Sequence, residues 1–489
     1  MIAYKLRISL LFAFLFTALR PDCFAQEKYL PYPAVIHIHS NVSGGGVYSP
    51  AGLANLAKST GIKILIFSDT FLSRWEYATP VLPNLLKISI DGGSVVRYGI
   101  RRYLENFKRV RKEFPDMLIL EGVEATPFYW WSGSLFKKNL TLHDGQKDLL
   151  VTGLRNYDDY ANLPVVGNRS FFPGLKDLPV LLIFLALFIS GVFIYQKKKP
   201  TRLLGAILSV AGFFFFLNYF PFSPSRYNSY HGYKKYLPYQ DLINYVKAKK
   251  GLIFWSHLTT TELSSAVKFA TVNFYSPNYP ESLALTVDYT GFAVSLSQGT
   301  GDDFILPGGA WDNILISYCA GKRKQPAWVI GEADYRGPGP IASEQNILLL
   351  SEFKPESVYG ALRQGRFYVR CYLKDEIDIS LDSFQVKDTL GAAGQTAFMG
   401  GEIKIKGKPT LRIRGTSKIN SIDVLNMQII RDGRVIKEAA FEKDGAFNSE
   451  FQDDLLQPSS RKSYYRLNFI LGGKIILAAN PIFIEMQNE

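Results

Sequence analysis

Two long apolar stretches interrupt the hydrophobic pattern of the chain. They are Leu178–Tyr195 and residues 203–220, and neither contains a charged residue. Each approaches the ~20 residues that a helix needs to cross a bilayer. The short segment between them carries four positive charges, at Lys197, Lys198, Lys199 and Arg202. Since such loops face the cytoplasm, the pattern predicts a transmembrane hairpin over residues 176–221 with both flanks outside; a buried pair of apolar helices is the alternative.

The first residues have the layout of a secretory signal peptide. Lys5 and Arg7 precede an apolar run over residues 8–19, and a short stretch then ends at Ala25. This pattern predicts a signal peptide over residues 1–25 with cleavage after Ala25. An uncleaved signal anchor is the alternative, and it leaves the following residues on the same side. Residues 26–175 are therefore expected outside the cytoplasm, in the periplasm, which agrees with the orientation of the hairpin.

Outside these apolar runs, short strands alternate with amphipathic helices. Residues 35–38 predict a strand, a helix follows from Ser49 as its N-cap to Gly61, and residues 62–67 predict a second strand. The same alternation returns after the hairpin and ends near residue 370. From Ile377 the pattern changes to short alternating runs separated by hairpin turns, which is typical of a β-sandwich.

These patterns place the protein in the α/β class and divide it into five parts. The expected parts are a signal peptide (1–25), the first part of an α/β domain (26–175), the transmembrane hairpin (176–221), the second part of that domain (222–372) and a β-sandwich (373–489). The hairpin would thus be an insertion within one domain. Both parts of that domain can meet only if they lie on the same side of the membrane.

Composition narrows the functional classes. The chain has 489 residues, 47% of them hydrophobic, and a formal charge of +13. Disorder is excluded as the dominant state by this apolar content. The basic residues are scattered, so we expect no nucleic-acid binding and attribute part of the excess charge to a membrane location. Only Cys319 and Cys371 follow the signal peptide, which excludes a disulfide framework.

The first candidate for chemistry is a pair of histidines in the first strand. His37 and His39 lie two residues apart. Because side chains alternate along a strand, both imidazoles are expected on one face, a spacing that suits two ligands of a metal ion. Ordinary strand histidines are the alternative. The second strand ends at Ser68 and Asp69, and the ends of parallel strands are where α/β folds bind their ligands.

The order of these features resembles a known family. An HxHS motif at His37, a glycine-rich turn, a Ser-Pro pair that opens a helix, and a strand ending in Asp69 resemble the start of a PHP domain, named for polymerases and histidinol phosphatase. The exported CehA/McbA-like type is the most similar, over roughly residues 30–370. The resemblance implies a distorted (β/α)7 barrel, here interrupted by the hairpin, with two or three metal ions at the C-terminal ends of its strands.

The resemblance also implies most of the metal ligands. Further motifs follow in the family's order: a GVE motif ends on Glu124, the run GLIFWSH ends on His257, and GEADYR contains Asp334. Leu258 replaces the proline that commonly follows the family's histidine. The family's glutamate bridges two metal ions, which is the role expected of Glu124.

One further ligand is ambiguous in the sequence. In the family a histidine precedes a short apolar run and a glycine, and here Asp148 stands at the aligned position while His143 lies five residues upstream. Both side chains can bind Zn, Mn or Fe. The implied ligand set is therefore His37, His39, Glu124, His257, Asp334 and one of His143 or Asp148.

The histidines that serve a third metal ion in the family are missing. Thr70 and Arg336 stand in their places, and the turn over residues 44–46 contains only glycine. Because every missing ligand belongs to one site, the resemblance implies a binuclear centre of two divalent ions, Mn, Zn or Fe. Asp69 is expected to orient an imidazole or a bound water. Arg336 is expected to hold a phosphate oxygen, with a structural ion pair as the alternative.

The activity implied is hydrolysis of a phosphomonoester or phosphodiester by a water that two metal ions activate. The alternative is a non-catalytic, metal-containing, membrane-anchored binding protein of the cell envelope; two spans scarcely support a transporter. Because the hairpin divides the ligand-bearing domain, we expect a lipid-linked or envelope-linked phosphate ester, with soluble periplasmic phosphates as the competing substrates. The sequence leaves the substrate, the metal and the oligomeric state open.

Overall fold

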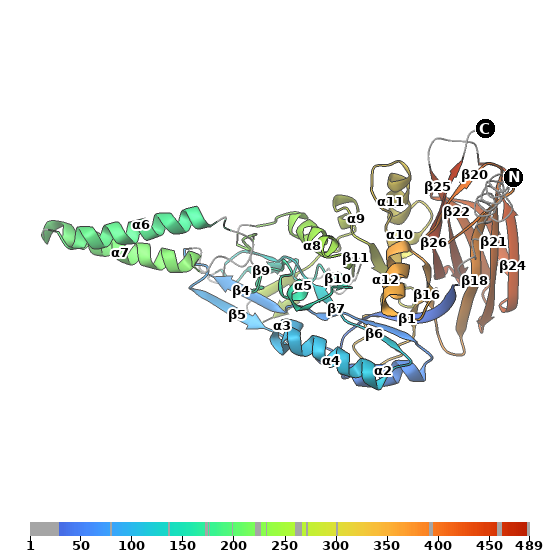
Figure 1. The fold of residues 1–489 in the computed structure, drawn as a ribbon, viewed down its shortest axis with the longest axis horizontal. Coiled ribbons are helices and arrows are strands. Elements are labelled where there is room, and N and C mark those ends of the chain that lie inside the picture. The colour runs from blue at the N-terminus through green and yellow to red at the C-terminus, as the bar shows by residue number, and fades with distance from the viewer. Residues whose placement is uncertain are drawn as a thin grey trace, which may run out of the picture.

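The computed structural model describes residues 29–486 except for 79–80, 135–136, 172–174, 176, 198, 221–225, 231, 260–266, 270–271, 300–301, 391–394 and 457–461. The predicted signal peptide lies outside these residues. The described chain is a mixed α/β protein with three parts along its long axis (Figure 1). Two apolar helices form one end, a mixed part lies in the middle, and a β-rich part forms the other end.

The mixed part begins with the expected strand, helix and strand. β1 (Leu30–Ile38) pairs in parallel with β2 (Ile64–Phe67), and α2 (Pro50–Ser59) connects them. Ser49 caps the helix, because its side chain accepts a hydrogen bond from the Gly52 N–H at 3.1 Å. β2 then pairs in parallel with β6 (Leu118–Leu120), which follows the amphipathic helix α4 (Ile100–Glu113). The C-terminal ends of β1 and β2 therefore lie at one edge.

A second sheet faces this edge. Its strand order is β15, β14, β11, β10, β7, β3. The strands are β3 (Asp69–Thr70), β7 (Gly122–Ala125), β10 (Leu149–Thr152), β11 (Leu252–Trp255), β14 (Gly291–Val294) and β15 (Trp328–Gly331). β10 runs antiparallel to both of its neighbours. The two parts of the α/β domain on either side of the apolar helices thus share one sheet, since β10 pairs with β11.

The two sheets meet at the end of β1. The N–H of His39 donates to the carbonyl oxygen of Tyr335 at 2.9 Å, and the N–H of Tyr335 donates to the carbonyl oxygen of His37 at 3.1 Å. These bonds bring the end of β1 beside the segment that follows β15. Pairing among the described strands does not close into one ring, so the seven-stranded barrel stays a prediction.

Shorter elements complete the mixed part. The helices are α3 (Val95–Tyr98), α5 (Tyr157–Ala161), α8 (Leu237–Ala248), α9 (Ser282–Leu285), α10 (Asp302–Ile305), α11 (Ala310–Cys319) and α12 (Pro355–Gln364). β4 (Arg74–Ala78) and β5 (Lys87–Asp91) form a separate antiparallel pair. A small sheet contains β8 (Trp130–Ser132), β9 (Leu140–His143), β12 (Val267–Phe269) and β13 (Val272–Tyr275).

The β-rich part is joined to the mixed part through a shared sheet. Its strands are β16 (Glu344–Leu350), β17 (Phe367–Cys371), β18 (Ile377–Asp388), β19 (Thr396–Phe398), β20 (Glu402–Ile405), β21 (Pro409–Ile419), β22 (Leu425–Arg431), β23 (Arg434–Phe441), β24 (Asp444–Gln452), β25 (Ser463–Leu471) and β26 (Lys474–Met486). One sheet has the order β19, β18, β21, β24. The other runs from β23 through β26 into β17, β16 and β1, so hydrogen bonds cross the boundary expected at residue 373.

The apolar helices α6 (Leu178–Tyr195) and α7 (Lys199–Tyr219) form an antiparallel pair that projects from the mixed part (Figure 1). Their mean hydropathies are 2.6 and 1.7, and both are long enough to cross a membrane. Gly205 permits their close approach, because a Cβ atom there would lie 2.3 Å from the backbone nitrogen of Tyr195. The length and hydropathy of the two helices are weak evidence for membrane association. The side of the membrane on which each flank lies stays a prediction.

Helix α7 begins earlier than the hydrophobic pattern indicates. The apolar run starts at Leu203, whereas the helix starts at Lys199. Lys199 and Arg202 thus lie in the first turn of α7 rather than in a loop. Pro200 suits a first helical turn because it needs no backbone hydrogen bond there, and lysine and arginine are good helix formers.

Candidate metal centre

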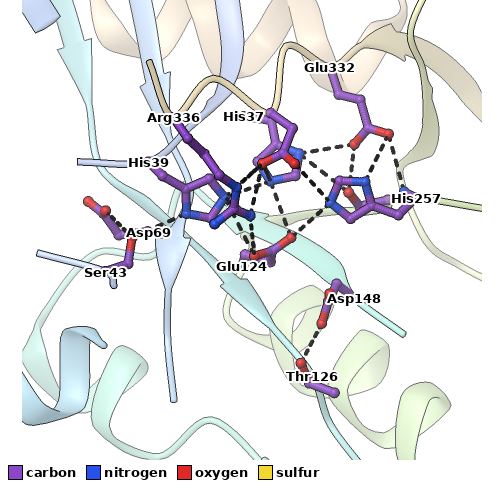
Figure 2. Close-up of polar contacts among 12 residues, drawn as sticks. His37, His39, Ser43, Asp69, Glu124, Thr126, Asp148, His257, Glu332 and Arg336 are labelled. Carbon is purple, nitrogen blue, oxygen red and sulfur yellow. Dashed lines mark hydrogen bonds and ion pairs between the residues drawn. The ribbon is translucent and has the colours of Figure 1, made fainter. Parts of the chain in front are cut away.

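Five of the residues singled out in the sequence converge at the meeting point of the two sheets (Figure 2). His37 and His39 come from the end of β1, Glu124 from β7, His257 from the residue pair after β11, and Asp334 from the segment after β15. The closest approaches between their ligand atoms are 3.1 Å for His37 Nε2 and His39 Nε2, 3.2 Å for His37 Nε2 and Glu124 Oε1, 3.2 Å for His257 Nε2 and Glu124 Oε1, and 3.1 Å for His39 Nε2 and Asp334 Oδ1.

These separations are those of hydrogen bonds, and they are also close to those expected around a shared metal ion. A zinc ion with four ligand bonds of about 2.0 to 2.1 Å places its ligand atoms about 3.3 Å apart, close to the spacing observed. Two groups could each hold an ion: His37, His39 and Glu124 form one, and His37, His257 and Asp334 form the other. Because His37 belongs to both groups, the number of ions is not decided by this geometry.

The backbone is unusual at three of the candidate ligands. The φ angles of His37, His257 and Asp334 are 66°, 50° and 36°, in the left-handed region that residues with a Cβ atom rarely adopt. At His37 the β1–β2 pairing also shifts register between Ile36 and Ile38. A bulge of this kind redirects side chains, so the two imidazoles converge through a local irregularity and not through the plain alternation that the sequence suggests.

Glu332 is a member of the cluster that the sequence reasoning missed. Its Oε2 lies 3.0 Å from His37 Nδ1 and accepts a hydrogen bond from Ser256 Oγ at 2.6 Å, and its Oε1 accepts one from the N–H of His257 at 3.2 Å. A carboxylate on the far nitrogen of a ligand histidine fixes the ring and its tautomer. The signal was present, because Glu332 directly follows β15 and lies two residues before Asp334.

Asp69 lies behind the cluster and is separated from His39 by the side chain of Ser43. Ser43 Oγ donates to Asp69 Oδ1 at 2.6 Å and lies 3.2 Å from His39 Nδ1, while Ser40 Oγ donates to Asp69 Oδ2 at 2.8 Å. Asp69 is fully buried and does not line the cavity described below. Asp69 is therefore linked to the His39 ring through Ser43 and does not line the space in front of the cluster, and its role in orienting the ring stays a prediction.

The two alternatives for the last ligand occupy different places. Asp148 directly precedes β10, in which Leu150 lies opposite Glu124, and it accepts a hydrogen bond from Thr126 Oγ1 (Figure 2). It lines the cavity in front of the cluster. Neither Asp148 nor its alternative belongs to the two metal-holding groups among the described residues.

His143 lies in the small sheet and outside the cavity lining. Its ring stacks on Trp130 with the centroids 3.8 Å apart, and its Nε2 lies 2.6 Å from Ser132 Oγ. Burial lowers the pKa of His143. The placement favours Asp148 over His143, and a ligand role for either one stays a prediction.

Arg336 extends from the same segment as Asp334 into the cluster. Its Nη2 lies 3.0 Å from His39 Nε2 and 3.0 Å from Asp334 Oδ1, and its Nε donates to Asp334 Oδ1 at 3.1 Å. Its side chain is 38% exposed and lines the cavity. The glycine turn packs against it, since a Cβ atom at Gly45 would lie 2.9 Å from Arg336 Nη1. Arg336 thus has both a structural ion pair and access to the cavity.

The charge distribution of the cluster favours a cation. Burial opposes protonation of His37, but the negative charges of Asp334 and Glu124 outweigh it and raise the pKa of His37 well above its ordinary value. Burial also opposes protonation of His257, yet Glu332 and Glu124 raise its pKa to about 9. Imidazoles that take up protons this readily show a negative potential at their nitrogen atoms, and that potential also stabilises a bound metal ion.

The same neighbouring charges and the burial of the cluster also shift the pKa values of its carboxylates. Burial would raise the pKa of Glu124, but the neighbouring His37 and His257 hold it well below its ordinary value. Asp148 behaves in the opposite way: burial, and then the negative charge of Glu124, raise its pKa to about 7. A positive charge between Glu124 and Asp148 would relieve that repulsion.

A cavity of about 540 Å³ opens in front of the cluster. Its lining comprises Thr70, Leu72, Ser73, Arg74, Trp75, Glu124, Thr126, Tyr129, Gly145, Gln146, Asp148, Val166, His257, Ser295, Gln298, Glu332, Asp334 and Arg336. This volume lies within the range of small-molecule sites. Four of the candidate ligands, Glu124, Asp148, His257 and Asp334, therefore border a space of the size that small molecules occupy.

Comparisons with known proteins do not identify the family of this chain. No family model matches the chain, and no curated protein matches it. A solved two-domain protein from Bacteroides vulgatus that contains a predicted PHP-like metal-dependent phosphoesterase is 10% identical over 93% of this chain and 95% of its own, with a TM-score of 0.36. A solved engineered protein is 8% identical over 93% of each chain, with a TM-score of 0.19. Neither likeness is close enough to support an argument.

Proposed function

We propose that this protein is a membrane-anchored, extracytoplasmic, metal-dependent phosphoesterase that hydrolyses a phosphomonoester or phosphodiester. One observation supports this best: two groups of candidate ligands share His37, and three of their members, Glu124, His257 and Asp334, line a 540 Å³ cavity. The proposal includes a distorted (β/α)7 barrel of the PHP type, a β-sandwich after residue 372, and an outward-facing catalytic domain. The positive charges at the tip of the apolar hairpin support that orientation.

The proposed centre holds two divalent ions, Mn, Zn or Fe. His37, His39 and Glu124 would hold one, and Glu124 would share the second with His257, Asp334 and Asp148. When bound, such ions polarise phosphate oxygens and make hydroxide available near neutral pH. Glu332 and Asp69 would position the rings of His37 and His39, since each carboxylate lies on the side of the ring away from the cluster.

Arg336 would bind the substrate rather than a metal ion. Of the two arginines that line the cavity, Arg74 is held by both oxygens of Asp91, at 2.5 and 3.1 Å. The guanidinium of Arg336 reaches the cluster and is partly exposed. A fork of N–H donors at this point suits a phosphate oxygen of the ester. We propose that Arg336 orients the ester and stabilises its negative charge.

A second candidate function is a non-catalytic, metal-containing binding protein of the cell envelope. The observation that favours it is the contact of 3.0 Å between Arg336 Nη2 and His39 Nε2, because a guanidinium at that nitrogen competes with a metal ion for the lone pair. Under this alternative the centre would be structural, and the cavity would bind an anionic ligand without cleaving it.

The deciding experiment measures metal content and hydrolysis on the same preparation. The full chain, purified in detergent, is analysed by mass spectrometry for bound metal and assayed with bis-p-nitrophenyl phosphate in the presence of Mn or Zn. Two equivalents of metal and hydrolysis are expected. Glu124→Gln should lose metal and turnover, whereas Glu352→Gln, at an exposed position, should behave as wild type. Bound metal without turnover on any ester would support the binding protein.

A further inference from the structure

Strand β5 and Leu86, the residue directly before it, present apolar side chains to solvent. Leu86, Ile88 and Ile90 alternate along the chain, and their exposed fractions are 55%, 69% and 52%. Alternate residues of a strand share one face, so these three form a continuous apolar stripe. Two charged residues of the strand pair with β4 instead: Lys87 pairs with Glu76 at 2.8 Å, and Asp91 pairs with Arg74.

The stripe begins where the apolar helix α7 ends. In the turn before β5, Val81 and Leu85 are also exposed, at 65% and 39%. Between them, the Asn84 N–H donates to Asn218 Oδ1 at 2.9 Å, and Asn84 Nδ2 donates to the carbonyl oxygen of Asn218 at 2.7 Å. Asn218 lies in the last turn of α7. Figure 1 shows β4 and β5 beside the end of the helix pair nearest the mixed part.

The other end of the β4–β5 pair reaches the cavity. Ile90 lies directly opposite Trp75 on β4, and Trp75 and Arg74 both line the cavity in front of the candidate metal centre. Trp75 is held by an edge contact with Phe274, whose ring centroid lies 5.7 Å away. Five residues of a strand span about 17 Å. The pair therefore connects the base of the apolar helices with the cavity by one continuous apolar face.

We propose that the apolar surface of Val81, Leu85, Leu86, Ile88 and Ile90 is a lipid contact that presents a membrane phosphate-ester lipid to the cavity. The lipid surface is the occupant because the stripe is continuous with α6 and α7, whose outward side chains are apolar and exposed. An exposed apolar strand of this kind is otherwise an aggregation hazard. The inference rests on the proposed function, and it narrows the substrate class to an amphiphilic lipid with a phosphate-ester headgroup.

In this arrangement the turn that contains Val81 and Leu85 enters the lipid interface beside α7. The acyl part of the substrate lies against Leu86, Ile88 and Ile90, and its headgroup reaches past Trp75 toward the cluster. Specificity for a lipid then comes from β5, while the chemistry stays with the groups at the end of β1 and β15. A second copy of this chain on the same surface is the other occupant that the experiments below separate.

The first test does not depend on activity. Leu86→Cys and Ile422→Cys are each labelled with a fluorophore in the full chain, reconstituted in phosphatidylcholine and phosphatidylglycerol vesicles whose acyl chains are brominated. Position 422 is the control, because it is 98% exposed in the β-rich part. Cys319 and Cys371 are buried. We expect quenching by the brominated chains at position 86 and none at position 422. Equal fluorescence at both positions, or shielding of position 86 without bromine dependence, would overturn the lipid contact.

The second test addresses the substrate. The variant Leu86→Ser/Ile88→Ser/Ile90→Ser is compared with the matched control Ile422→Ser/Val424→Ser/Leu455→Ser, whose positions are 98%, 57% and 75% exposed. Each is assayed on soluble bis-p-nitrophenyl phosphate and on a phospholipid with a nitrophenyl phosphate headgroup in vesicles. The ratio of lipid to soluble hydrolysis should fall at least tenfold in the β5 variant alone. An unchanged ratio would overturn the presentation of substrate.

The two tests also separate this inference from the proposed function. Quenching at position 86 with no hydrolysis of either ester by wild type would refute the phosphoesterase and keep the lipid contact. Hydrolysis of the soluble ester without quenching would refute the lipid contact and keep the phosphoesterase.

Discussion

The Nδ1 atom of His37 lies 3.0 Å from Oε2 of Glu332. With the proton on Nδ1 shared with this carboxylate, the lone pair of His37 Nε2 points toward Glu124, His39 and Asp334. Ser256 Oγ and the N–H of His257 hold Glu332 in place. Glu332 therefore determines the orientation of the one histidine that belongs to both candidate metal groups.

Replacing Glu332 should weaken metal binding without unfolding the protein. Glu332→Gln keeps the shape of the side chain but removes the charge that fixes the tautomer of His37. Loss of such a partner lowers metal affinity by about 10- to 100-fold. Titration of the metal-free protein with Zn or Mn in a calorimeter measures the change. Glu352→Gln is the control, and wild-type affinity in Glu332→Gln would show that the carboxylate has no role in the centre.

A matched pair of variants decides between the two alternatives for the last ligand. Asp148→Asn should reduce both the metal content and the hydrolysis of soluble ester by at least tenfold, because Asp148 and Glu124 line the same cavity. His143→Gln should keep both within about twofold, because the ring stacks on Trp130 away from the cavity. Metal analysis and kinetics on the two proteins provide the comparison, and the reverse pattern would assign the ligand to His143.

The orientation of the apolar hairpin can be read with reporter fusions. A reporter that is active only in the periplasm should work when fused after residue 175 or at the C-terminus, and it should be inactive at Pro200, which lies at the tip of the hairpin in the first turn of α7. The reason is the positive charge of the tip. A cytoplasmic reporter at the same sites should give the opposite pattern, and periplasmic activity at Pro200 would refute the hairpin as a membrane-spanning unit.

Glu344 should make the stability of the protein depend on pH. Burial raises its pKa to about 8 from an ordinary 4.5, although the N–H of Ser297 donates to its Oε2 at 2.9 Å. Because the folded state holds this proton more tightly than the unfolded state, its contribution to stability is complete below pH 4.5 and is lost as the pH rises through 8. The loss relative to Glu344→Gln should approach about 1.4 kcal/mol per pH unit in this window.

Thermal unfolding of wild type and Glu344→Gln between pH 4 and 9 measures this effect. The two midpoints should be similar near the lower limit, and the midpoint of wild type should fall further as the pH rises. Parallel curves for the two proteins would show that Glu344 is ionised in the folded state throughout.

Most local features of the helices could be predicted from the sequence. The start of α2 follows from Ser49 and Pro50, and its end lies just before Gly61, because caps and turns depend on a few neighbouring residues. The apolar lengths of α6 and α7 are likewise readable from composition. The start of α7 at Lys199 was not, since charged residues that favour helix formation extend the helix beyond its apolar run.

At the candidate site, the sequence likewise indicated some of the residues and missed another. Motif order in the sequence pointed to His37, His39, Glu124, His257 and Asp334, which the structure gathers into one cluster. Their role as metal ligands stays a prediction. Glu332 escaped notice because its partner His37 is 295 residues away. Its spacing of two residues from Asp334 was a local signal, but that spacing does not show which imidazole the carboxylate contacts.

By itself, the sequence determined the periodic elements, the two apolar helices and the residue types available for chemistry, because hydrophobic alternation, helix caps and charge depend on nearest neighbours. Only the tertiary structure decided which of these side chains meet. It placed Asp148 in one cavity with Glu124 and His143 beside Trp130, and it turned the apolar face of β5 toward solvent. Such outcomes depend on strand pairing between residues far apart in the chain, and that pairing is specified by the packing of the whole molecule rather than by any single segment.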